Sequence, residues 1–287
     1  MRFWCAKTLS PWSWEFQAYP GVWATVLVLA GPYLWAQHRR NGPNPHRARH
    51  TAFWLAGVVV FWVATDWPLG LLGASYLASA HMLQFLLYTL VVAPLLLLGV
   101  PEWMARRVLE RLNLYRFTAR LSRPLVAGLV FNAALVATHS PWAVDTLRAS
   151  QFLSFVMDAI WLAAGLVLWL PIAAPLPEFR QASRPVKMAY LFLAAGVVPA
   201  IPGGFLTFAS FPLYATYELA PRVHGLAADV DQQMAGLAMK LGGIPVVWGV
   251  IMAQMLLWAK ESGVGRPPDR SGSGPPVQLS PRPPGLA

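Results

Sequence analysis

The sequence has few charged residues and almost no cysteine. Only 12% of its 287 residues are charged and 56% are hydrophobic, whereas about a quarter of a typical soluble domain is charged. This composition argues against a soluble globular protein, and the apolar content excludes a chain that is mostly disordered. The single cysteine, Cys5, excludes an internal disulfide and any metal site built from cysteines alone. The His-Glu-x-x-His motif of zinc proteases is also absent.

Long apolar runs dominate the sequence instead. A membrane-crossing helix needs about 20 mainly apolar residues, and seven runs approach or exceed that length, with short loops between them. We therefore predict an all-α, polytopic membrane protein with seven transmembrane helices in one domain, residues 21–260. The runs are Gly21–Ala36, Thr51–Leu72, Tyr76–Gly99, Pro124–His139, Phe152–Ala173, Val186–Ser210 and Gln232–Trp258.

Positive charge is distributed unevenly among the loops. Most Lys and Arg follow the first, third, fifth and seventh runs, and the opposite side carries only Arg2, Lys7, Arg148 and Arg222. The excess marks the cytoplasmic side, so we predict an outer N-terminus and a cytoplasmic C-terminus. The formal net charge of +10 then reflects topology, and we expect a lipid bilayer rather than nucleic acid as its partner.

Three segments lie outside the predicted spans. We expect residues 1–20 to form an outer tail and not a signal peptide, because no apolar run directly follows their basic residues. Residues 261–287 are rich in Pro, Gly, Ser and Arg and are predicted to form a disordered cytoplasmic tail. The segment Pro101–Phe117 interleaves arginines with apolar residues, which fits either an interfacial helix or a charged loop that only fixes orientation.

Polar residues inside the spans are costly and suggest function. Nearly all of them fall toward the predicted outer side. They are Asp66, His81, Gln84, His139, Asp158, Asp231 and Lys240. We predict that Asp158 and Lys240 form a buried ion pair, because an unpaired charge at their depth would be expensive.

A copper site is one interpretation of this set. Imidazole and thioether groups suit Cu(I), so His81, His139 and Met82 are candidate ligands, with Asp231 as a further one. Structural roles compete with each assignment. The histidines could be hydrogen-bonded helix-end residues, the methionine could be packing, and Asp231 could favour a helix N-terminus.

Several motifs resemble one known family. The run from His81-Met-Leu-Gln-Phe85 through Ala-Pro to Leu-Gly-Val-Pro101 resembles the third-span signature of the multi-spanning CtaG family of bacterial cytochrome c oxidase assembly factors. Asp231-Gln-Gln-Met-Ala-Gly-Leu237 is similar to that family too, and the resemblance covers about residues 50–260. It implies a non-catalytic protein of the bacterial inner membrane that assists assembly of a haem–copper oxidase, with oxidase subunits as partners and copper as the metal.

The sequence departs from the family pattern at three positions. Phe85 and Asp158 stand where the resemblance implies histidines, and Lys240 stands at a position that is usually apolar or aromatic. One hypothesis is that an Asp158–Lys240 pair replaces part of a metal site, since a nearby cation weakens copper binding. The opposing hypothesis is that the remaining groups suffice, because Cu(I) needs only two or three soft ligands.

Other functions fit the sequence less well. A copper or proton transporter is the alternative, since prolines such as Pro94 and Pro245 could break spans at a transport site, although the inner leaflet is nearly bare of polar residues. A retinal protein would need a lysine in the seventh span, which Lys240 supplies, but its surroundings do not resemble that family. A serine protease would need a nucleophile and a base on facing helices, and we find no such pair.

Overall fold

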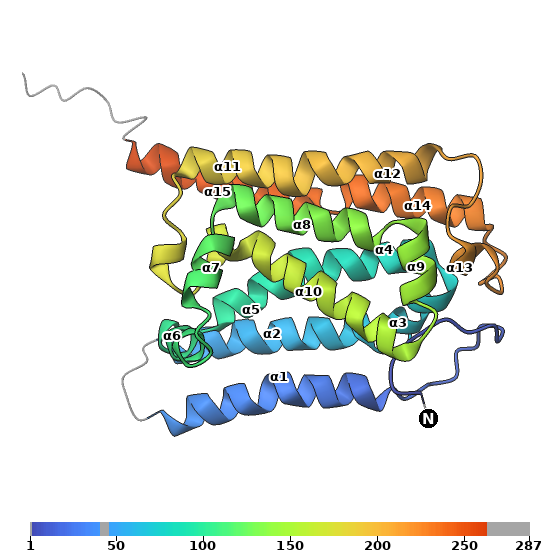
Figure 1. The fold of residues 1–287 in the computed structure, drawn as a ribbon, viewed down its shortest axis with the longest axis horizontal. Coiled ribbons are helices and arrows are strands. Elements are labelled where there is room, and N and C mark those ends of the chain that lie inside the picture. Colours follow the sequence, from blue (N-terminus) through green and yellow to red (C-terminus); the bar gives the residue numbers. More distant parts are fainter. Residues whose placement is uncertain (1, 41–45, 263–287) are drawn as a thin grey trace, which may run out of the picture.

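The structure is a computed structural model that describes residues 2–40 and 46–262, and every regular element in those residues is helical. Long helices run side by side along the molecule (Figure 1). Four of them are single elements, namely α1 (Pro20–Arg39), α2 (Arg47–Thr65), α8 (Pro124–Thr138) and α10 (Gln151–Ala173). The others are composed of successive elements, namely α4 (Ala78–Leu86) with η2 (Leu87–Val92) and α5 (Ala93–Gly99), α11 (Arg184–Leu191) with η4 (Phe192–Val197) and α12 (Val198–Phe208), and α14 (Ala228–Leu241) with α15 (Ile244–Glu261).

Short helices occupy the two ends of this bundle. One end, which we call the α9 end, carries the N-terminal segment and the helices α3 (Leu69–Leu71), η1 (Leu72–Tyr76), α9 (Pro141–Leu147) and α13 (Ala215–Glu218). The opposite end, which we call the α6 end, carries the helices α6 (Glu102–Arg111), α7 (Tyr115–Leu121) and η3 (Pro177–Phe179). Figure 1 shows α6 nearly end-on, so it runs across the direction of the long helices.

The all-helical membrane fold predicted from the sequence is confirmed. Five helical segments are long and apolar enough to cross a membrane, namely Arg47–Thr65, Ala78–Gly99, Gln151–Ala173, Arg184–Phe208 and Ala228–Glu261. A sixth is reached only if α7 and α8, which meet at 84°, count as one span. The predicted seven spans and the orientation of the termini stay predictions.

The second predicted run ends earlier than expected. Its helix stops at Thr65, not Leu72, and the chain then turns through α3 and η1. Asp66 caps the end of α2, where its Oδ1 accepts the backbone N–H of Trp67 at 2.9 Å. Pro68 follows and cannot donate the hydrogen bond that a continuing helix requires.

Prolines inside the spans have two different effects. Pro94 and Pro199 are the second residues of α5 and α12, and each of these helices is preceded by a π-helical segment, η2 or η4. Such segments accommodate the backbone groups that a proline leaves without a helical partner, so these helices continue. At Pro245, by contrast, the helix is interrupted, because α14 ends at Leu241 and α15 begins at Ile244.

Small residues let helices approach closely. A Cβ at Gly236 would lie 2.6 Å from the backbone nitrogen of Thr207, so α14 packs directly on α12. A Cβ at Gly165 would lie 2.7 Å from Cα of Thr89, where α10 crosses η2. Trp169 on α10 strengthens that crossing, because its indole N–H donates to the Thr89 carbonyl at 2.8 Å.

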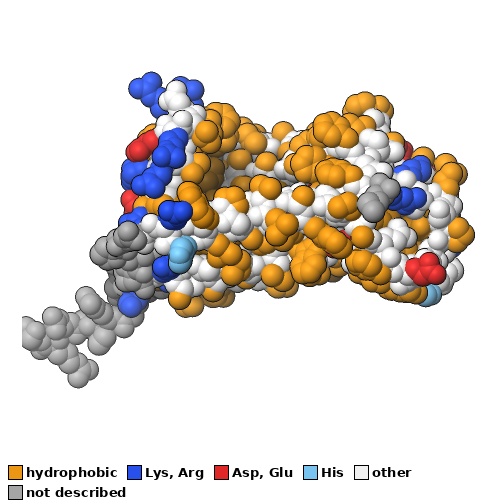
Figure 2. Space-filling view, turned by 90° about the horizontal axis from the view of Figure 1, so that it is seen from below, with side chains coloured by type: hydrophobic (Ala, Val, Ile, Leu, Met, Phe, Trp, Pro, Cys, Tyr) orange, Lys and Arg blue, Asp and Glu red, His pale blue; other side chains and the backbone are white. Residues whose placement is uncertain are grey.

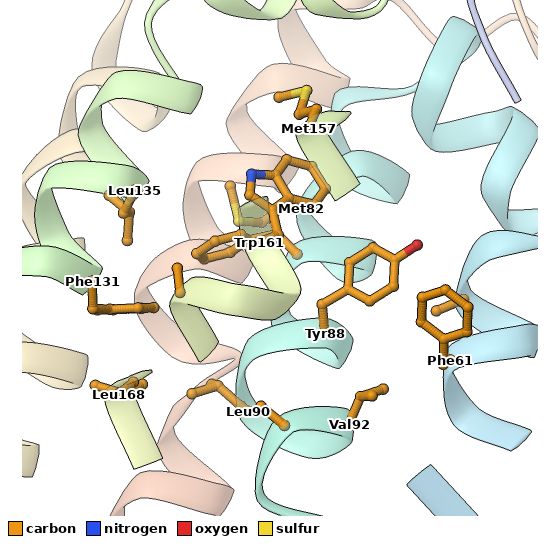
Figure 3. Packing of buried hydrophobic residues seen from close by; sticks show 14 of the residues in the cluster. Phe61, Met82, Tyr88, Leu90, Val92, Phe131, Leu135, Met157, Trp161 and Leu168 are labelled. Atoms are coloured by element: carbon orange, nitrogen blue, oxygen red, sulfur yellow. The ribbon is translucent and has the colours of Figure 1, made fainter. Parts of the chain in front are cut away.

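The core lies where α4, η2, α8 and α10 meet. Figure 3 shows Trp161 among Tyr88, Phe131 and Leu135, and all four side chains are at most 2% exposed. Large apolar side chains also remain exposed along the long helices, and Figure 2 shows them on one face. Such a surface is expected of a protein that faces lipid, where helices need only satisfy their own backbone groups.

Two predicted segments have different outcomes. Within Pro101–Phe117, residues 102–111 form α6, so a helix is confirmed there and a charged loop is not. The predicted disordered tail, residues 261–287, lies outside the described residues apart from its first two positions.

Candidate functional site

His81 and His139 lie together in the core near the α9 end. His81 is on α4 and His139 caps the end of α8, and their ring centroids are 5.6 Å apart. Both side chains are buried. The structure therefore brings together the two histidines that the sequence singled out, whereas their role as metal ligands stays a prediction.

A tyrosine fixes the orientation of His81. The Tyr217 hydroxyl donates to the Gly73 carbonyl at 2.7 Å and lies 2.7 Å from Nδ1 of His81. Burial raises the pKa of Tyr217, so its hydroxyl keeps its proton. Since that proton points to Gly73, Nδ1 of His81 donates to the tyrosine oxygen, and Nε2 carries the lone pair.

His139 has the same arrangement with a backbone partner. Its Nδ1 lies 2.9 Å from the Leu135 carbonyl oxygen, which can only accept a hydrogen bond. Its Nε2 therefore also carries a lone pair. Within residues 2–40 and 46–262, Nε2 of both histidines is buried without a hydrogen-bond partner. Metal-binding histidines use this arrangement, in which one ring N–H is held and the other nitrogen binds.

Trp161 is the central side chain of this cluster. Its ring centroid is 4.7 Å from that of His81 and 5.6 Å from that of His139. The indole N–H donates to the Thr138 hydroxyl at 3.0 Å. Phe85, at the position where the resemblance implied a histidine, packs edge-on against His139 with centroids 4.6 Å apart. Aromatic rings therefore surround the two histidines.

Asp158 pairs with Arg148, so the predicted Asp158–Lys240 ion pair is wrong. The Arg148 Nη1 lies 3.0 Å from Oδ1 of Asp158, and both side chains are almost fully buried. The guanidinium also lies over Trp161, 5.0 Å from the ring centroid. Burial disfavours the charge on Arg148, but the Asp158 carboxylate outweighs it and raises the pKa of the guanidinium.

Lys240 lies away from Asp158, because its helix α14 packs against α12 and α4. Its Nζ sits 4.7 Å from the ring centroid of Phe208 on α12, and the side chain is half-buried. A cation over an aromatic face gains electrostatic stabilisation without a carboxylate. The structure therefore contradicts the hypothesis that an Asp158–Lys240 pair replaces part of a metal site, because the two side chains do not pair.

The N-terminal segment folds over Asp158. The Trp4 indole N–H donates to Oδ2 of Asp158 at 2.8 Å, and the backbone N–H of Lys7 donates to the Arg148 carbonyl at 2.9 Å. Cys5 is buried beside them, and its thiol donates to the Thr65 carbonyl. Burial raises the pKa of Cys5, so its thiol is a neutral packing group. The expected tail is thus packed against the bundle.

Asp231 caps a helix in the structure. Its Oδ2 accepts the backbone N–H of Ala78 at 2.5 Å, and its Oδ1 accepts the N–H and the hydroxyl of Ser79. A carboxylate from α14 thus stabilises the N-terminus of α4, where the helix dipole favours negative charge. Both of its oxygens accept these hydrogen bonds, and the role of Asp231 as a metal ligand stays a prediction. In the described residues no group of three or more His, Cys, Asp or Glu could hold a metal.

Two buried methionines lie in the cluster around Trp161. Met82 follows His81 on α4, and Met157 lies one turn before Trp161 on α10. Both side chains are buried, and Figure 3 shows them with Trp161. A thioether is a soft ligand, so Met82 stays a candidate and Met157 joins it.

Asp66 and Gln84 connect helices. Oδ2 of Asp66 accepts indole N–H groups from Trp23 on α1 and Trp62 on α2, each at 2.7 Å. Gln84 on α4 donates to the Ala64 carbonyl of α2 at 2.8 Å. These predicted buried polar residues therefore hold helices together.

Sequence reasoning missed four residues of the cluster, which are Trp4, Arg148, Trp161 and Tyr217. The charge count places Arg148 only among the outer-loop charges, although it precedes Asp158 closely in the chain. A signal existed there, because a buried carboxylate needs a cation within reach. No comparable signal pointed to Tyr217, which lies on a four-residue helix and reaches His81 only through the tertiary fold.

Comparison with known proteins gives these residues a family context. A family model described as cytochrome c oxidase caa3 assembly factor matches residues 31–261. Uncharacterized proteins of Mycobacterium bovis and Mycobacterium tuberculosis are each 26% identical to this chain over 267 residues. The alignments cover 86% of this chain but only 40% of each relative, so the chain spans less than half of their length. No solved structure matches the chain.

Proposed function

Because the chain belongs to the family of cytochrome c oxidase caa3 assembly factors, we propose that it assists maturation of the oxidase copper centre in a bacterial inner membrane. The family indicates a role in assembly rather than catalysis. That role implies an interaction with an oxidase, and we propose Cu(I) as the cargo. The observation that carries it is the pair of buried imidazole nitrogens on His81 and His139.

The two histidines fit Cu(I) as a cargo. Both Nδ1 atoms are held by hydrogen bonds, and both Nε2 atoms lack a partner within the described part of the chain. Cu(I) accepts two or three soft ligands, so two imidazoles and one thioether from Met82 or Met157 would suffice. Burial among aromatic rings would exclude water from the cargo.

Arg148 is compatible with this cargo because Asp158 neutralises it. A bare guanidinium near the histidines would repel a cation. The ion pair at 3.0 Å instead carries no net charge. In this proposal Asp158 therefore acts on the metal site only through Arg148.

We further propose the seven-span topology. In it, α1 and α8 join the five segments that satisfy the length and hydropathy criteria. The arginine-rich α6 end then faces the cytoplasm, as the positive-inside rule requires. The two histidines consequently lie toward the outer face, and the proposed cargo would be handed over there.

The experiment is complementation in a bacterium that lacks this protein. We expect the wild-type chain to restore copper in the purified oxidase, and His81→Ala/His139→Ala to restore little at an equal level of chain in the membrane. The matched control is His38→Ala/His224→Ala, because these two histidines are exposed. If the His81→Ala/His139→Ala variant restored the copper content of the oxidase as fully as the wild-type chain, the proposal would be overturned.

A transport assay separates this proposal from the alternative of a copper or proton transporter. Proteoliposomes that contain the purified chain should show no uptake of copper or protons above protein-free vesicles. Uptake that His81→Ala abolishes would instead identify a transporter.

A further inference from the structure

A cavity at the α6 end is lined almost entirely by apolar side chains. Its volume is 450 Å³, which is within the range of small-molecule sites. It lies between the crossing helix α6 and the long helices α1, α2, α5 and α10. Its lining includes Leu97, Met104, Ala105, Leu109, Leu166 and Phe179.

The helix that covers this cavity is amphipathic. Met104, Val108 and Leu109 of α6 line the cavity, while Arg107 and Arg111 on the same helix are exposed. α6 also runs across the long helices (Figure 1). A short amphipathic helix in this orientation is typical of the membrane interface, with its apolar side toward the acyl chains.

Two arginines flank a tryptophan beside the cavity. The guanidinium carbons of Arg40 and Arg107 lie 4.5 Å and 5.7 Å from the ring centroid of Trp103, which precedes Met104. Neither arginine forms an ion pair within the described residues, whereas Arg106 is paired with two glutamates. Figure 2 shows basic side chains gathered at one end of the molecule. The two arginines are therefore available to an anion.

We infer that this cavity binds one acyl chain of an anionic phospholipid, whose headgroup contacts Arg40 and Arg107. The apolar lining matches an acyl chain, and the two arginines match a phosphate. A tryptophan such as Trp103 prefers the level of the headgroups. The site gives this membrane protein a specific lipid ligand, independently of any metal at the α9 end.

The chemistry of the cavity and its surroundings favours a lipid over a helix from another protein. Its lining is almost entirely apolar, and Arg40 and Arg107 beside Trp103 have no ion pair within the described residues. An acyl chain is narrow enough to enter it, and the two unpaired arginines explain the preference for an anionic headgroup.

The test measures lipid binding by the full chain in detergent, using native mass spectrometry. Dioleoyl phosphatidylglycerol, dioleoyl phosphatidylcholine and glycerol 3-phosphate are the three probes. We expect a one-to-one adduct with phosphatidylglycerol that survives detergent removal. Phosphatidylcholine should bind about tenfold more weakly or worse, because it lacks the net negative charge, and glycerol 3-phosphate should not bind. Equal retention of both phospholipids would overturn the assignment of an anionic headgroup.

Charge variants test the headgroup contacts. Each basic side chain contributes about fivefold to binding of an anionic lipid, so Arg40→Gln/Arg107→Gln should weaken phosphatidylglycerol binding roughly thirtyfold. The control is Arg116→Gln/Arg120→Gln, which removes the same charge from exposed positions on α7. An equal loss in the control would show diffuse attraction by the surface and would overturn the proposed site.

A variant that fills the cavity tests whether an acyl chain binds there. Val108→Trp should block the cavity and abolish the phosphatidylglycerol adduct, because Val108 lines the cavity and is 46% exposed, so the larger ring need not disturb the core. Leu112→Trp is the control, since Leu112 is exposed and is not part of the lining. Undiminished binding by a folded Val108→Trp variant would contradict the inference.

Discussion

At the residue scale, the two buried histidines differ from ordinary core histidines in the nitrogen that lacks a partner. Each donates its Nδ1 hydrogen within the protein, and each keeps a free lone pair on Nε2 in the described part of the chain. A core histidine normally satisfies both nitrogens, because an unpaired buried polar atom is costly. That cost is consistent with the proposed site, which a metal would complete.

Tyr217→Phe should weaken Cu(I) binding without unfolding the protein. The substitution removes the oxygen that accepts the His81 Nδ1 hydrogen, and loss of such a partner typically lowers metal affinity about 10–100-fold. Competition with a Cu(I) chelator measures the change. Tyr214→Phe is the control, because that hydroxyl donates to the His139 carbonyl and not to an imidazole. An unchanged affinity of Tyr217→Phe for Cu(I) would contradict the role of Tyr217 in positioning His81.

Asp158→Asn should destabilise the protein strongly and Lys240→Gln only weakly. Removing one partner of a buried ion pair typically costs about 3–5 kcal/mol, and Arg148 would be left unpaired at 0% exposure. Lys240 would lose only its contact with Phe208. Thermal unfolding in detergent compares the two variants. Equal destabilisation by both would contradict the assignment of Arg148 as the partner.

At the element scale, the helices follow from apolar run length, while their ends follow from side-chain chemistry. The sequence predicted Pro124–His139 and Phe152–Ala173 almost to the residue, because apolar residues fill both helices. It misplaced the end of α2, where Asp66 and Pro68 stop the helix inside an apolar run. Hydropathy cannot detect a cap of this kind.

Gly165→Ala should loosen the contact between α10 and η2. The added Cβ would lie 2.7 Å from Cα of Thr89, a backbone atom that cannot rotate away. Overpacking of this kind costs about 1–3 kcal/mol. Gly196→Ala is the control, because open space surrounds that position. Thermal unfolding should show a lower midpoint for Gly165→Ala alone, and equal midpoints would contradict the close approach.

At the scale of the whole molecule, the two ends of the bundle have different chemistry. The α9 end holds the buried imidazole pair, and the α6 end holds the exposed arginines and the apolar cavity. Charge counting along the sequence predicted that basic residues gather at one end. It could not predict which side chains meet, since contacts such as Trp4 with Asp158 join segments 154 residues apart.

Cysteine labelling tests the proposed orientation. Leu219→Cys lies between α12 and α14 at the α9 end, and Leu112→Cys lies at the α6 end. Both leucines are exposed, and the buried Cys5 should contribute little background. A membrane-impermeant maleimide should label only Leu219→Cys in intact spheroplasts and both variants after lysis. The reverse pattern would invert the topology.

The measurement that tests the central claim most directly is copper per chain in the purified protein after loading with Cu(I) under reducing conditions. We predict close to one copper per wild-type chain, and background copper in His81→Ala/His139→Ala, with the same melting profile before loading. Background copper in the wild-type chain, or equal copper in both proteins, would contradict a cargo site at the paired imidazoles.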